Sequence, residues 1–303
     1  MTPGRRGWTD LFDPGRAEDF FRRLGDGSRP AFASSSDWAS DRWDAARAWW
    51  CSEVSRASYR RDGRPAFFAA AGFEELRAFE AGSLHAVLLR AAGVSFLAFR
   101  GTDEPQDWLV NVRARLVEWS EGGRVHEGFA RGLDALWRKI EPALVDLGAP
   151  VVAVGHSLGG ALATLALARA PLAAAYTFGA PRVGDEAFGR TLRGPMFRVV
   201  HGRDPVPCVP PRRWGFRHAG ERHDAHASTG WGTSADSRLD GLTRLFSEVD
   251  LIAPPAALAD HAPVRYSDAL QAAAGGGAPP RAGPPRAGGP PAGAGAPRGE
   301  ATR

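Results

Sequence analysis

The chain has 303 residues, of which 44% are hydrophobic and 24% charged, a balance typical of a folded globular protein. Its formal net charge of +4 comes from arginine, since Lys139 is the single lysine, and no arginine cluster alternates with aromatic residues, so a nucleic-acid partner is not expected. Two cysteines, Cys51 and Cys208, are too few for a disulfide framework, and no apolar run is long enough to give a transmembrane segment.

Both ends of the chain differ in composition from its middle. The first 37 residues are polar and rich in proline and glycine, with one short helix predicted over 17–24, and they are interpreted as an N-terminal extension. Residues 275–303 contain only Gly, Ala, Pro, Arg, Glu and Thr, which predicts a disordered tail because none of these side chains builds a core. One folded domain is therefore expected over 38–274.

The N-terminal sequence predicts a cytoplasmic location. Two arginines, Arg5 and Arg6, are followed by no apolar segment of the kind that an ordinary secretory signal requires. Export by a route without such a signal is left open.

Two helices are predicted before the first strands. Residues 38–58 have helical spacing, and Asp41 or Ser40 is expected to cap their start. Residues 73–80 are predicted to form a second, short helix. The apolar face of the first helix is interpreted as core and carries Trp43, Ala46, Trp50, Val54 and Ala57.

Strand and helix patterns alternate over the rest of the domain. A hairpin is predicted over 84–89 and 94–99, and a long helix follows over 125–148, kinked or broken at Pro142. The later strand patterns are 151–154, 173–178, 197–200 and 214–218, and a weak helix is expected within 256–274. The alternation predicts an α/β fold with a mostly parallel central sheet covered by helices on both faces.

The segment 151–169 carries the strongest chemical signal. Residues 151–154 predict a buried strand, residues 161–169 predict a helix, and the turn at 155–159 has the pattern G-x-S-x-G. Such a turn holds Ser157 in a strained conformation above the end of the sheet, and its glycines avoid collisions with neighbouring backbone. The alternative is an ordinary glycine-serine turn in a Rossmann-like unit, because glycine is abundant, at 37 of 303 residues.

A serine nucleophile needs a base, and the base needs a carboxylate that orients it. On an α/β-hydrolase scaffold these groups follow the chain order Ser, Asp, His, and Asp204, directly after the predicted strand 197–200, fits the second place. Position favours His261 as the base, with His226 as its main rival. The other histidines after Asp204 are His218 and His223.

The tetrahedral intermediate of such a reaction needs N–H donors for its oxyanion. The backbone amide of Leu158 is one expected donor, because it lies at the start of the helix that follows the serine. Thr102, in the loop after the predicted strand 94–99, is the other expected donor.

Residues 103–115 mix apolar and charged side chains directly after Thr102. They are interpreted as a lid that covers the active-site mouth in water and contacts lipid when it opens. The alternative is a fixed helix that Asp107 caps and that buries Trp108 permanently. The lid residues singled out are Asp103, Asp107, Trp108 and Leu109.

Other histidines have structural interpretations. His126 and His156 are interpreted as structural rather than catalytic. His223, Asp224 and His226 include two imidazoles and a carboxylate, which suit zinc, but a polar surface loop is favoured because no fourth ligand is evident. Neither a metal nor a cofactor is expected.

Several stretches together resemble the fungal-type, class 3 lipases of the α/β-hydrolase superfamily, in that family's order and over roughly residues 40–272. They are FRGTD (99–103), DWLVN (107–111), VHEGF (125–129), VGHSLGGALA (154–163), TFGAPRVGD (177–185), GRDPVPCVPP (202–211), and Asp260 and His261 followed by Tyr266. Unlike secreted fungal members, this chain is expected to have neither a signal peptide nor a disulfide set.

The resemblance implies hydrolysis of carboxylic esters, chiefly acylglycerols, through an acyl-enzyme. It implies Ser157 as nucleophile, Asp204 as orienting acid and His261 as base, with Thr102 and Leu158 as oxyanion donors. The implied partner is a lipid or ester substrate, met at a lipid interface through the lid. The alternatives are a phospholipase A1, a short-chain esterase, and a non-catalytic relative that binds a ligand or partner.

Overall fold

The computed structural model describes residues 32, 37–38, 40–101, 115–145, 147–225 and 259–274. The predicted helix 17–24 and the predicted tail 275–303 lie outside these residues. So do Thr102, the four lid residues and His226.

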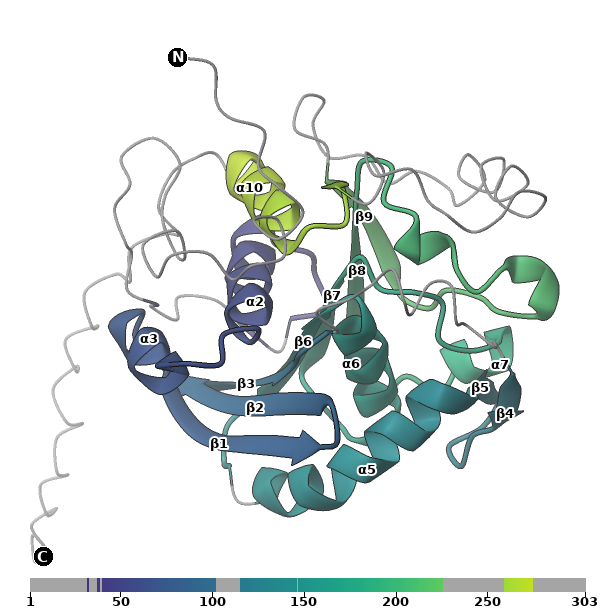
Figure 1. Ribbon diagram of the computed structural model, residues 1–303, viewed down its shortest axis with the longest axis horizontal. Helices are drawn as coiled ribbons and strands as arrows, with labels where there is room; N and C mark the ends of the chain where they lie inside the picture. The colour runs from purple at the N-terminus through teal and green to yellow at the C-terminus, as the bar shows by residue number, and fades with distance from the viewer. Residues whose placement is uncertain are drawn as a thin grey trace, which may run out of the picture.

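A seven-stranded sheet forms the centre of the described part of the chain (Figure 1). Its strands lie in the order β1-β2-β3-β6-β7-β8-β9, parallel from β3 onward, with β1 and β2 antiparallel. The sheet is thus mostly parallel, as predicted. The strands are β1 (Glu74–Ala81), β2 (Leu84–Ala91), β3 (Val94–Phe99), β6 (Val151–His156), β7 (Ala174–Phe178), β8 (Met196–His201) and β9 (Glu221–Ala225).

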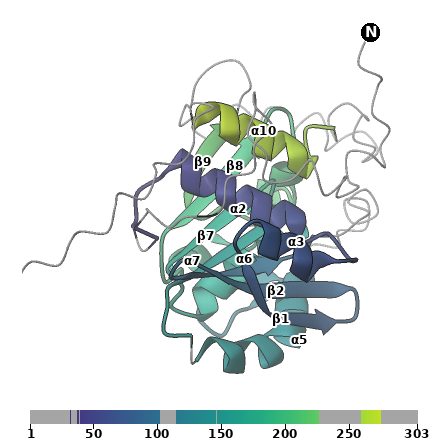
Figure 2. The same cartoon turned by 90° about the vertical axis from the view of Figure 1, so that its left-hand side faces the viewer.

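Helices cover both faces of the sheet, which confirms the predicted layering (Figure 2). On one face α2 (Ala45–Ala57) and α10 (Pro263–Ala273) pack over Val152 and Val154 of β6. On the other face α5 (Glu127–Leu144) and α6 (Leu158–Arg169) pack over Val151 and Ala153. Successive residues of β6 therefore point to opposite cores, which explains why the strand is apolar from Val151 to Val154.

A buried polar contact joins α2 to α10, two helices from opposite ends of the domain. The hydroxyl of Ser267 donates to the carboxylate of Glu53 at 2.6 Å, and the guanidinium of Arg56 donates to the same carboxylate at 2.9 Å. All three side chains are buried. Because a buried carboxylate is stable only when it is paired, this contact fixes the position of α10 on α2.

The predicted short helix over 73–80 is wrong. These residues form β1, which pairs with β2 in an antiparallel register from Glu74 to Ala81. The segment is rich in helix-forming Glu, Ala and Leu, but pairing with a neighbouring strand outweighs that weak local preference. The local helix lies earlier, at α3 (Arg64–Ala70), where Pro65 occupies the first turn.

The first helix begins later than predicted. Neither Ser40 nor Asp41 caps it; the carboxylate of Asp44 accepts the N–H of Arg47 at 2.7 Å, and α2 begins at Ala45. Trp43 therefore lies before the helix, where its ring stacks on that of His223 at 3.6 Å between centroids. Pro142 does not end the long helix, since α5 continues to Leu144.

The predicted strand 214–218 is also wrong. Arg212–Trp214 form a short 3-10 helix, η3, and the last strand of the sheet is β9. The sequence of β9 is polar, yet this edge strand buries His223 and Asp224. Its charges are paired, because Arg222 contacts the Asp224 carboxylate at 2.6 Å. Since the buried residues of this strand are polar, its sequence lacks the hydrophobic pattern on which strand prediction depends.

The remaining short elements border the central layers. They are the ribbon of β4 (Leu116–Glu118) and β5 (Arg124–His126), the helix α7 (Glu186–Gly189) and the 3-10 helix η2 (Val206–Cys208).

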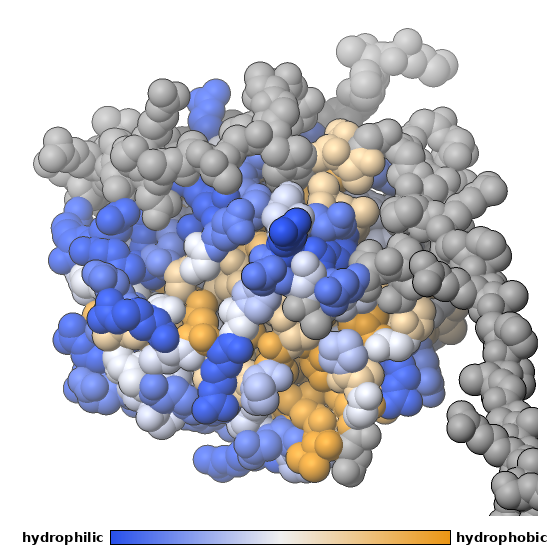
Figure 3. All heavy atoms as spheres, turned by 180° about the vertical axis from the view of Figure 1, so that it is seen from behind, coloured by the Kyte–Doolittle hydropathy of each residue, from blue (hydrophilic) through white to orange (hydrophobic). Residues whose placement is uncertain are grey.

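No helix in the described ranges is both long and apolar enough to cross a bilayer. Viewed from behind, apolar side chains gather in the lower half of the surface (Figure 3).

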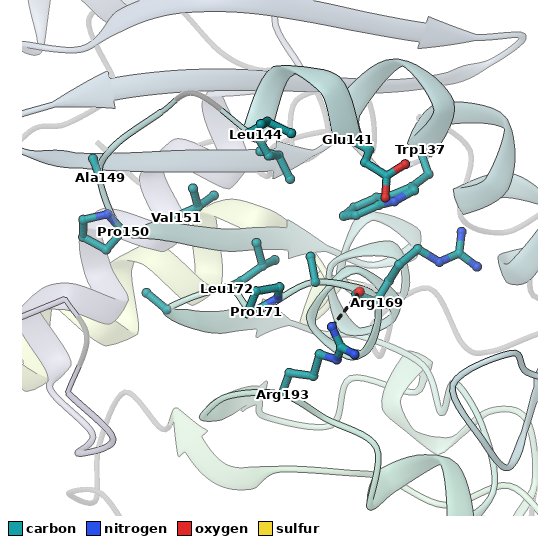
Figure 4. A pocket seen from close by; sticks show the side chains of 13 residues that line it. Trp137, Glu141, Leu144, Ala149, Pro150, Val151, Arg169, Pro171, Leu172 and Arg193 are labelled. Carbon is teal, nitrogen blue, oxygen red and sulfur yellow. Dashed lines mark hydrogen bonds between the residues drawn. The ribbon is translucent and has the colours of Figure 1, made fainter.

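A hollow of about 670 Å³ opens at the amino ends of β6 and β7 (Figure 4). Leu144, Pro150 and Leu172 give it apolar walls, and the guanidinium of Arg193 contacts the carbonyl of Arg169 beside it. This edge of the sheet is opposite to the carboxyl ends, where Ser157 and Asp204 lie. The hollow is therefore separate from the predicted catalytic residues.

Candidate active site

The G-x-S-x-G turn joins β6 to α6 with Ser157 between them. Ser157 has φ 57° and ψ −126°, a region that costs energy for a residue with a side chain. Its N–H donates to the carbonyl of Phe178 in β7 at 2.9 Å, which holds the turn in place. The predicted strained turn is therefore present, at the carboxyl edge of the sheet.

The glycines on either side of Ser157 allow the sharp turn. A Cβ on Gly155 would overlap the backbone of Gly159, and a Cβ on Gly159 would overlap the carbonyl of Phe99 in β3. In both cases the obstacle is backbone, which cannot move aside as a flexible side chain can. This close approach of helix and strand is the steric reason predicted for the two glycines.

We expect Gly159→Ala to lower the free energy of unfolding by about 3 kcal/mol, because the new methyl group must push α6 away from β3. Urea unfolding monitored by circular dichroism measures the change. Gly189→Ala is the matched control, since its Cβ would lie 3.3 Å from the methyl group of Ala219 rather than inside backbone. Equal stability of the two variants would contradict the steric explanation.

Asp204 and His261 contact each other in the protein interior. The Nδ1 atom of His261 donates to Oδ2 of Asp204 at 2.7 Å, and both side chains are fully buried. The other carboxylate oxygen accepts the N–H of Val206 at 2.8 Å, and the hydroxyl of Tyr266 also donates to Oδ2. Asp204 therefore lies after β8, as predicted, and fixes His261 with Nε2 as the nitrogen available to take up a proton.

The loop that carries His261 is attached to the turn after β8. The carboxylate of Asp260 accepts the N–H of Arg203 at 2.8 Å, and Gly202, with φ 52°, leaves room for that carboxylate. Gly179 likewise leaves room on the other side of the pair, because a Cβ there would collide with the side chains of Asp204 and His261. The segments that carry Asp204 and His261 are thus held in place by contacts with backbone.

The structure brings the pair next to the turn that carries Ser157. His156 precedes Ser157, and its Nε2 lies 2.7 Å from the backbone carbonyl of His261. Gly179, which contacts the pair, follows Phe178, whose carbonyl accepts the Ser157 N–H. Ser157 is 1% exposed. The three residues predicted as a triad therefore come together at one edge of the sheet.

The other candidate histidines lie elsewhere or outside the described residues. His218 contacts the carbonyl of Pro207 at 2.8 Å. His223 faces Glu221 and stacks on Trp43. The polar surface loop expected around His223 is wrong, because the residue is buried in β9. Among the described residues no three His, Cys, Asp or Glu side chains are grouped as metal ligands would be.

One of the two predicted oxyanion donors is in the described part of the chain. Leu158 is the first residue of α6, so its N–H belongs to the first turn, where amides have no partner within the helix. That position gives it the orientation expected of a donor toward charge beside Ser157. Thr102 follows Gly101, the last described residue after β3, and therefore lies outside the described residues.

His126 has the structural place that was predicted for it. It is the N-cap of α5, and its Nδ1 accepts the N–H groups of Gly128 and Phe129 at 3.1 and 3.4 Å. Burial lowers its pKa from 6.5 to about 4, against a smaller opposing effect of the Glu127 carboxylate. The imidazole is therefore neutral at pH 7, as an acceptor of two N–H groups must be.

We expect this histidine to contribute to loss of stability in acid. Because its pKa is lower in the folded state, the unfolded chain binds more protons between pH 6.5 and about 4, so stability is complete above pH 6.5 and falls as the pH decreases through that range. The slope is at most about 1.4 kcal/mol per pH unit for one such group. His126→Asn keeps a good cap without a titrating group, so unfolding of this variant measured from pH 7 to 4.5 should have the smaller slope.

Sequence reasoning assigned no role to three residues that contact the pair or its neighbours, Tyr59, Asp260 and Tyr266. Asp260 and Tyr266 were part of the family resemblance, whereas Tyr59 was missed altogether. The contact of Tyr59 with His156 joins residues 97 positions apart. No local pattern marks such a contact, whereas a tyrosine shortly after the candidate base could have been tested as its neighbour.

Comparison with known families shows what this chain is similar to. A family model described as Lipase (class 3) matches residues 96–214. Over these residues the chain is similar to the class 3 lipases. The matched residues include β3, the turn at Ser157 and Asp204, while His261 lies beyond them.

Curated relatives are similar to part of the chain. The "Secreted mono- and diacylglycerol lipase 1" of Fusarium solani is 34% identical over 136 residues, covering 40% of this chain and 41% of that protein. A "Lipase" of Rhizomucor miehei is 32% identical over 148 residues, covering 42% and 40%. The chain therefore spans about two-fifths of the length of the curated relatives it matches.

Solved structures are similar in fold. The triacylglyceride lipase of Rhizomucor miehei matches with a TM-score of 0.57 and 24% identity, covering 71% of this chain and 91% of that one. Together with the sheet order, this similarity establishes the predicted α/β-hydrolase fold.

The predicted cytoplasmic location is wrong. The relative from Fusarium solani is named a secreted lipase, and so are relatives from Penicillium cyclopium and Malassezia globosa. The prediction depended on the absence of an apolar signal segment after Arg5 and Arg6. A missing pattern is weaker evidence than residues that are present.

Proposed function

We propose that this chain is a class 3 lipase, which hydrolyses carboxylic esters of lipids through an acyl-enzyme on Ser157. The observation that carries the proposal is the buried hydrogen bond between Asp204 and His261 beside the strained serine turn. An orienting carboxylate, an imidazole and a serine on a positive-φ turn have one common use, which is nucleophilic attack on a carbonyl carbon.

The proposed reaction proceeds in two halves. The Oγ atom of Ser157 attacks the ester carbonyl while Nε2 of His261 accepts its proton, and Asp204 stabilises the imidazolium that forms. The imidazolium then gives this proton to the leaving alcohol oxygen, which leaves the acyl group on Ser157. In the second half His261 removes a proton from water, the resulting hydroxide attacks the acyl carbon, and the carboxylic acid departs as Ser157 recovers its proton.

The oxyanion of each tetrahedral intermediate needs donors that are in place before it forms. We propose the N–H of Leu158 as one donor, because the first turn of α6 points its amides at the space beside Ser157. Thr102 is the proposed second donor. Loss of one such donor typically lowers the rate by 10²- to 10³-fold.

The proposed substrates are acylglycerols, met outside the cell. Two of the similar proteins described above are named a secreted mono- and diacylglycerol lipase and a triacylglyceride lipase, and this chain has the pair of residues that such chemistry requires. Phospholipase A1 and short-chain esterase activities use the same chemistry, and we keep them as alternatives that a substrate panel distinguishes. A ligand-binding relative without catalysis is the alternative of another class.

A fluorophosphonate probe tests the proposed reaction. The purified chain should form a covalent phosphonyl adduct that tandem mass spectrometry locates on Ser157, and p-nitrophenyl esters from C2 to C16, assayed beside a phospholipid, should rank the substrates. An unlabelled protein with no esterase activity would favour the binding alternative. Preference for the phospholipid would favour the phospholipase A1 alternative.

We also propose that residues 103–115 form a lid with Asp103, Asp107, Trp108 and Leu109. Exposing one large apolar side chain to water costs roughly 1.5–3 kcal/mol, so a lid of this composition should close without a lipid surface. Trp108→Ser should then lower activity on emulsified long-chain esters more than on dissolved short-chain esters. Equal losses on both substrates would support the fixed helix instead.

A further inference from the structure

A second histidine lies beside the proposed nucleophile, and the reaction above does not use it. His156 is the last residue of β6, and it is 1% exposed. Both of its ring nitrogens have partners: Nδ1 lies 3.0 Å from the hydroxyl of Tyr59, and Nε2 lies 2.7 Å from the backbone carbonyl of His261. A buried histidine with two such partners is held in one orientation.

The partners determine where the ring proton lies. A carbonyl oxygen can only accept, so Nε2 of His156 carries the hydrogen and donates it to His261. Nδ1 is then an acceptor, and the hydroxyl of Tyr59 donates to it. Burial, reinforced by the neighbouring His261, lowers the pKa of His156 far below its usual value, so this neutral form persists at pH 7.

Neutrality of His156 suits the proposed reaction. The two imidazole rings are 4.4 Å apart between centroids. A positive charge on His156 would therefore oppose the imidazolium that must form on His261 when it accepts the serine proton. A neutral N–H donor satisfies the buried carbonyl of His261 without that penalty.

Tyr59 connects this histidine to the strand that precedes the proposed oxyanion donor. Tyr59 follows the end of α2 and is 5% exposed. A Cβ on Gly101 would overlap the hydroxyl of Tyr59, so the backbone at Gly101, next to Thr102, packs directly on that hydroxyl. The hydrogen bonds that run from Tyr59 through His156 to the backbone of His261 therefore begin at a hydroxyl that packs on Gly101, the residue before Thr102.

We propose that His156 and Tyr59 are positioning residues, which hold the main chain of His261 so that its imidazole stays between Asp204 and Ser157. The inference rests on the proposed ester hydrolysis. Asp204 fixes one ring nitrogen of His261, and His156 fixes the backbone from which that ring projects. Since misplacement of a reacting group by about 1 Å can cost about 10²-fold in rate, a lost backbone anchor has a measurable effect.

Three variants test the proposal, with a fourth as control. His156→Leu removes both hydrogen bonds, His156→Gln keeps a donor and an acceptor, and Tyr59→Phe removes the hydroxyl alone. His223→Leu is the matched control, because that histidine is also buried against the same sheet but packs on Trp43. The readouts are the rate of fluorophosphonate labelling of folded protein, and kcat and KM for a dissolved short-chain ester.

We expect His156→Leu to lower kcat and the labelling rate about 100-fold with KM within about twofold, which a loss of stability alone would not do. His156→Gln should recover to within about fivefold of the original rate, Tyr59→Phe should lose about five- to tenfold, and the control should keep its rate. Should His156→Leu fail to fold, the other two variants carry the test.

Three results would overturn the inference. They are labelling of folded His156→Leu within threefold of the original rate, Gln and Leu variants that are equally slow, or a Tyr59→Phe variant as fast as the original. Absence of labelling in the unaltered protein would instead overturn the proposed function itself, and the inference with it.

Discussion

Ser157→Ala should lower kcat for ester hydrolysis by about 10⁵-fold and leave the fold intact. The expected loss is that of a nucleophile that acts as a unit with its base, where only oxyanion stabilisation and binding remain. The fold should persist because the Ser157 hydroxyl is buried without a hydrogen-bond partner among the described residues, so its removal leaves no donor or acceptor unsatisfied. Steady-state kinetics and a thermal unfolding curve measure the two effects.

Ser95→Ala is the control for this substitution. Ser95 is also fully buried, in the neighbouring strand β3, and its hydroxyl likewise has no partner in the described residues. The same atom is thus deleted a short distance from the proposed site, and kcat should not change. Activity of Ser157→Ala within about tenfold of the original would refute the nucleophile assignment.

Asp204→Asn should lower kcat by about 10⁴-fold, because it changes which nitrogen of His261 holds the proton. The carboxylate accepts from three donors: the N–H of Val206, the hydroxyl of Tyr266 and Nδ1 of His261. An asparagine has one oxygen and one NH₂ group, so it cannot accept from all three. If the NH₂ group faces His261, the ring proton moves to Nε2, which can then no longer accept the serine proton.

The matched control is Asp185→Asn. Asp185 caps α7 by accepting the N–H of Phe188 at 2.9 Å, and asparagine caps a helix about as well as aspartate. We expect its kcat to be unchanged. A pre-steady-state burst measured for Asp204→Asn should show slower acylation rather than weaker binding, and a kcat within tenfold of the original would remove Asp204 from the proposed triad.

The centre of the fold could be predicted because its signals are local. The buried strand β6, the glycines at 155 and 159 and the helix after Ser157 lie within 19 consecutive residues, 151–169, and each has a steric or hydrophobic cause visible in the sequence. The hairpin of β2 and β3 was predicted for the same reason. These parts need no knowledge of distant chain segments.

The edges of the sheet could not be predicted in this way. Strand β1 has helix-forming residues and becomes a strand only because β2 offers it backbone partners. Strand β9 is buried although it contains the polar residues Arg222, His223 and Asp224, whose partners are reached only on folding. In both strands the deciding interaction comes from another segment.

The same difference between local signals and contacts with distant segments applies to the candidate site. Ser157 and Asp204 follow predicted strands, so local patterns indicated where they would lie. Position only favoured His261 among four histidines, and the match of Asp260 and His261 to a family strengthened that choice. His261 lies in a segment that contacts α2 and the turn after β8, and nothing in its own neighbours specifies those contacts. Tyr59 is the extreme case, because its partner is 97 residues away.

The attachment of α10 to α2 has a consequence for when the chain becomes able to act. The bond from Ser267 to Glu53 spans 214 residues, and α10 also carries Tyr266, which contacts Asp204. A ribosome releases the segment around His261 only after β6 and Ser157 have emerged, since it lies about 100 residues further along the chain. A growing chain therefore holds its proposed nucleophile before its proposed base has been made. A protease that removed α10 would abolish the proposed activity without touching Ser157.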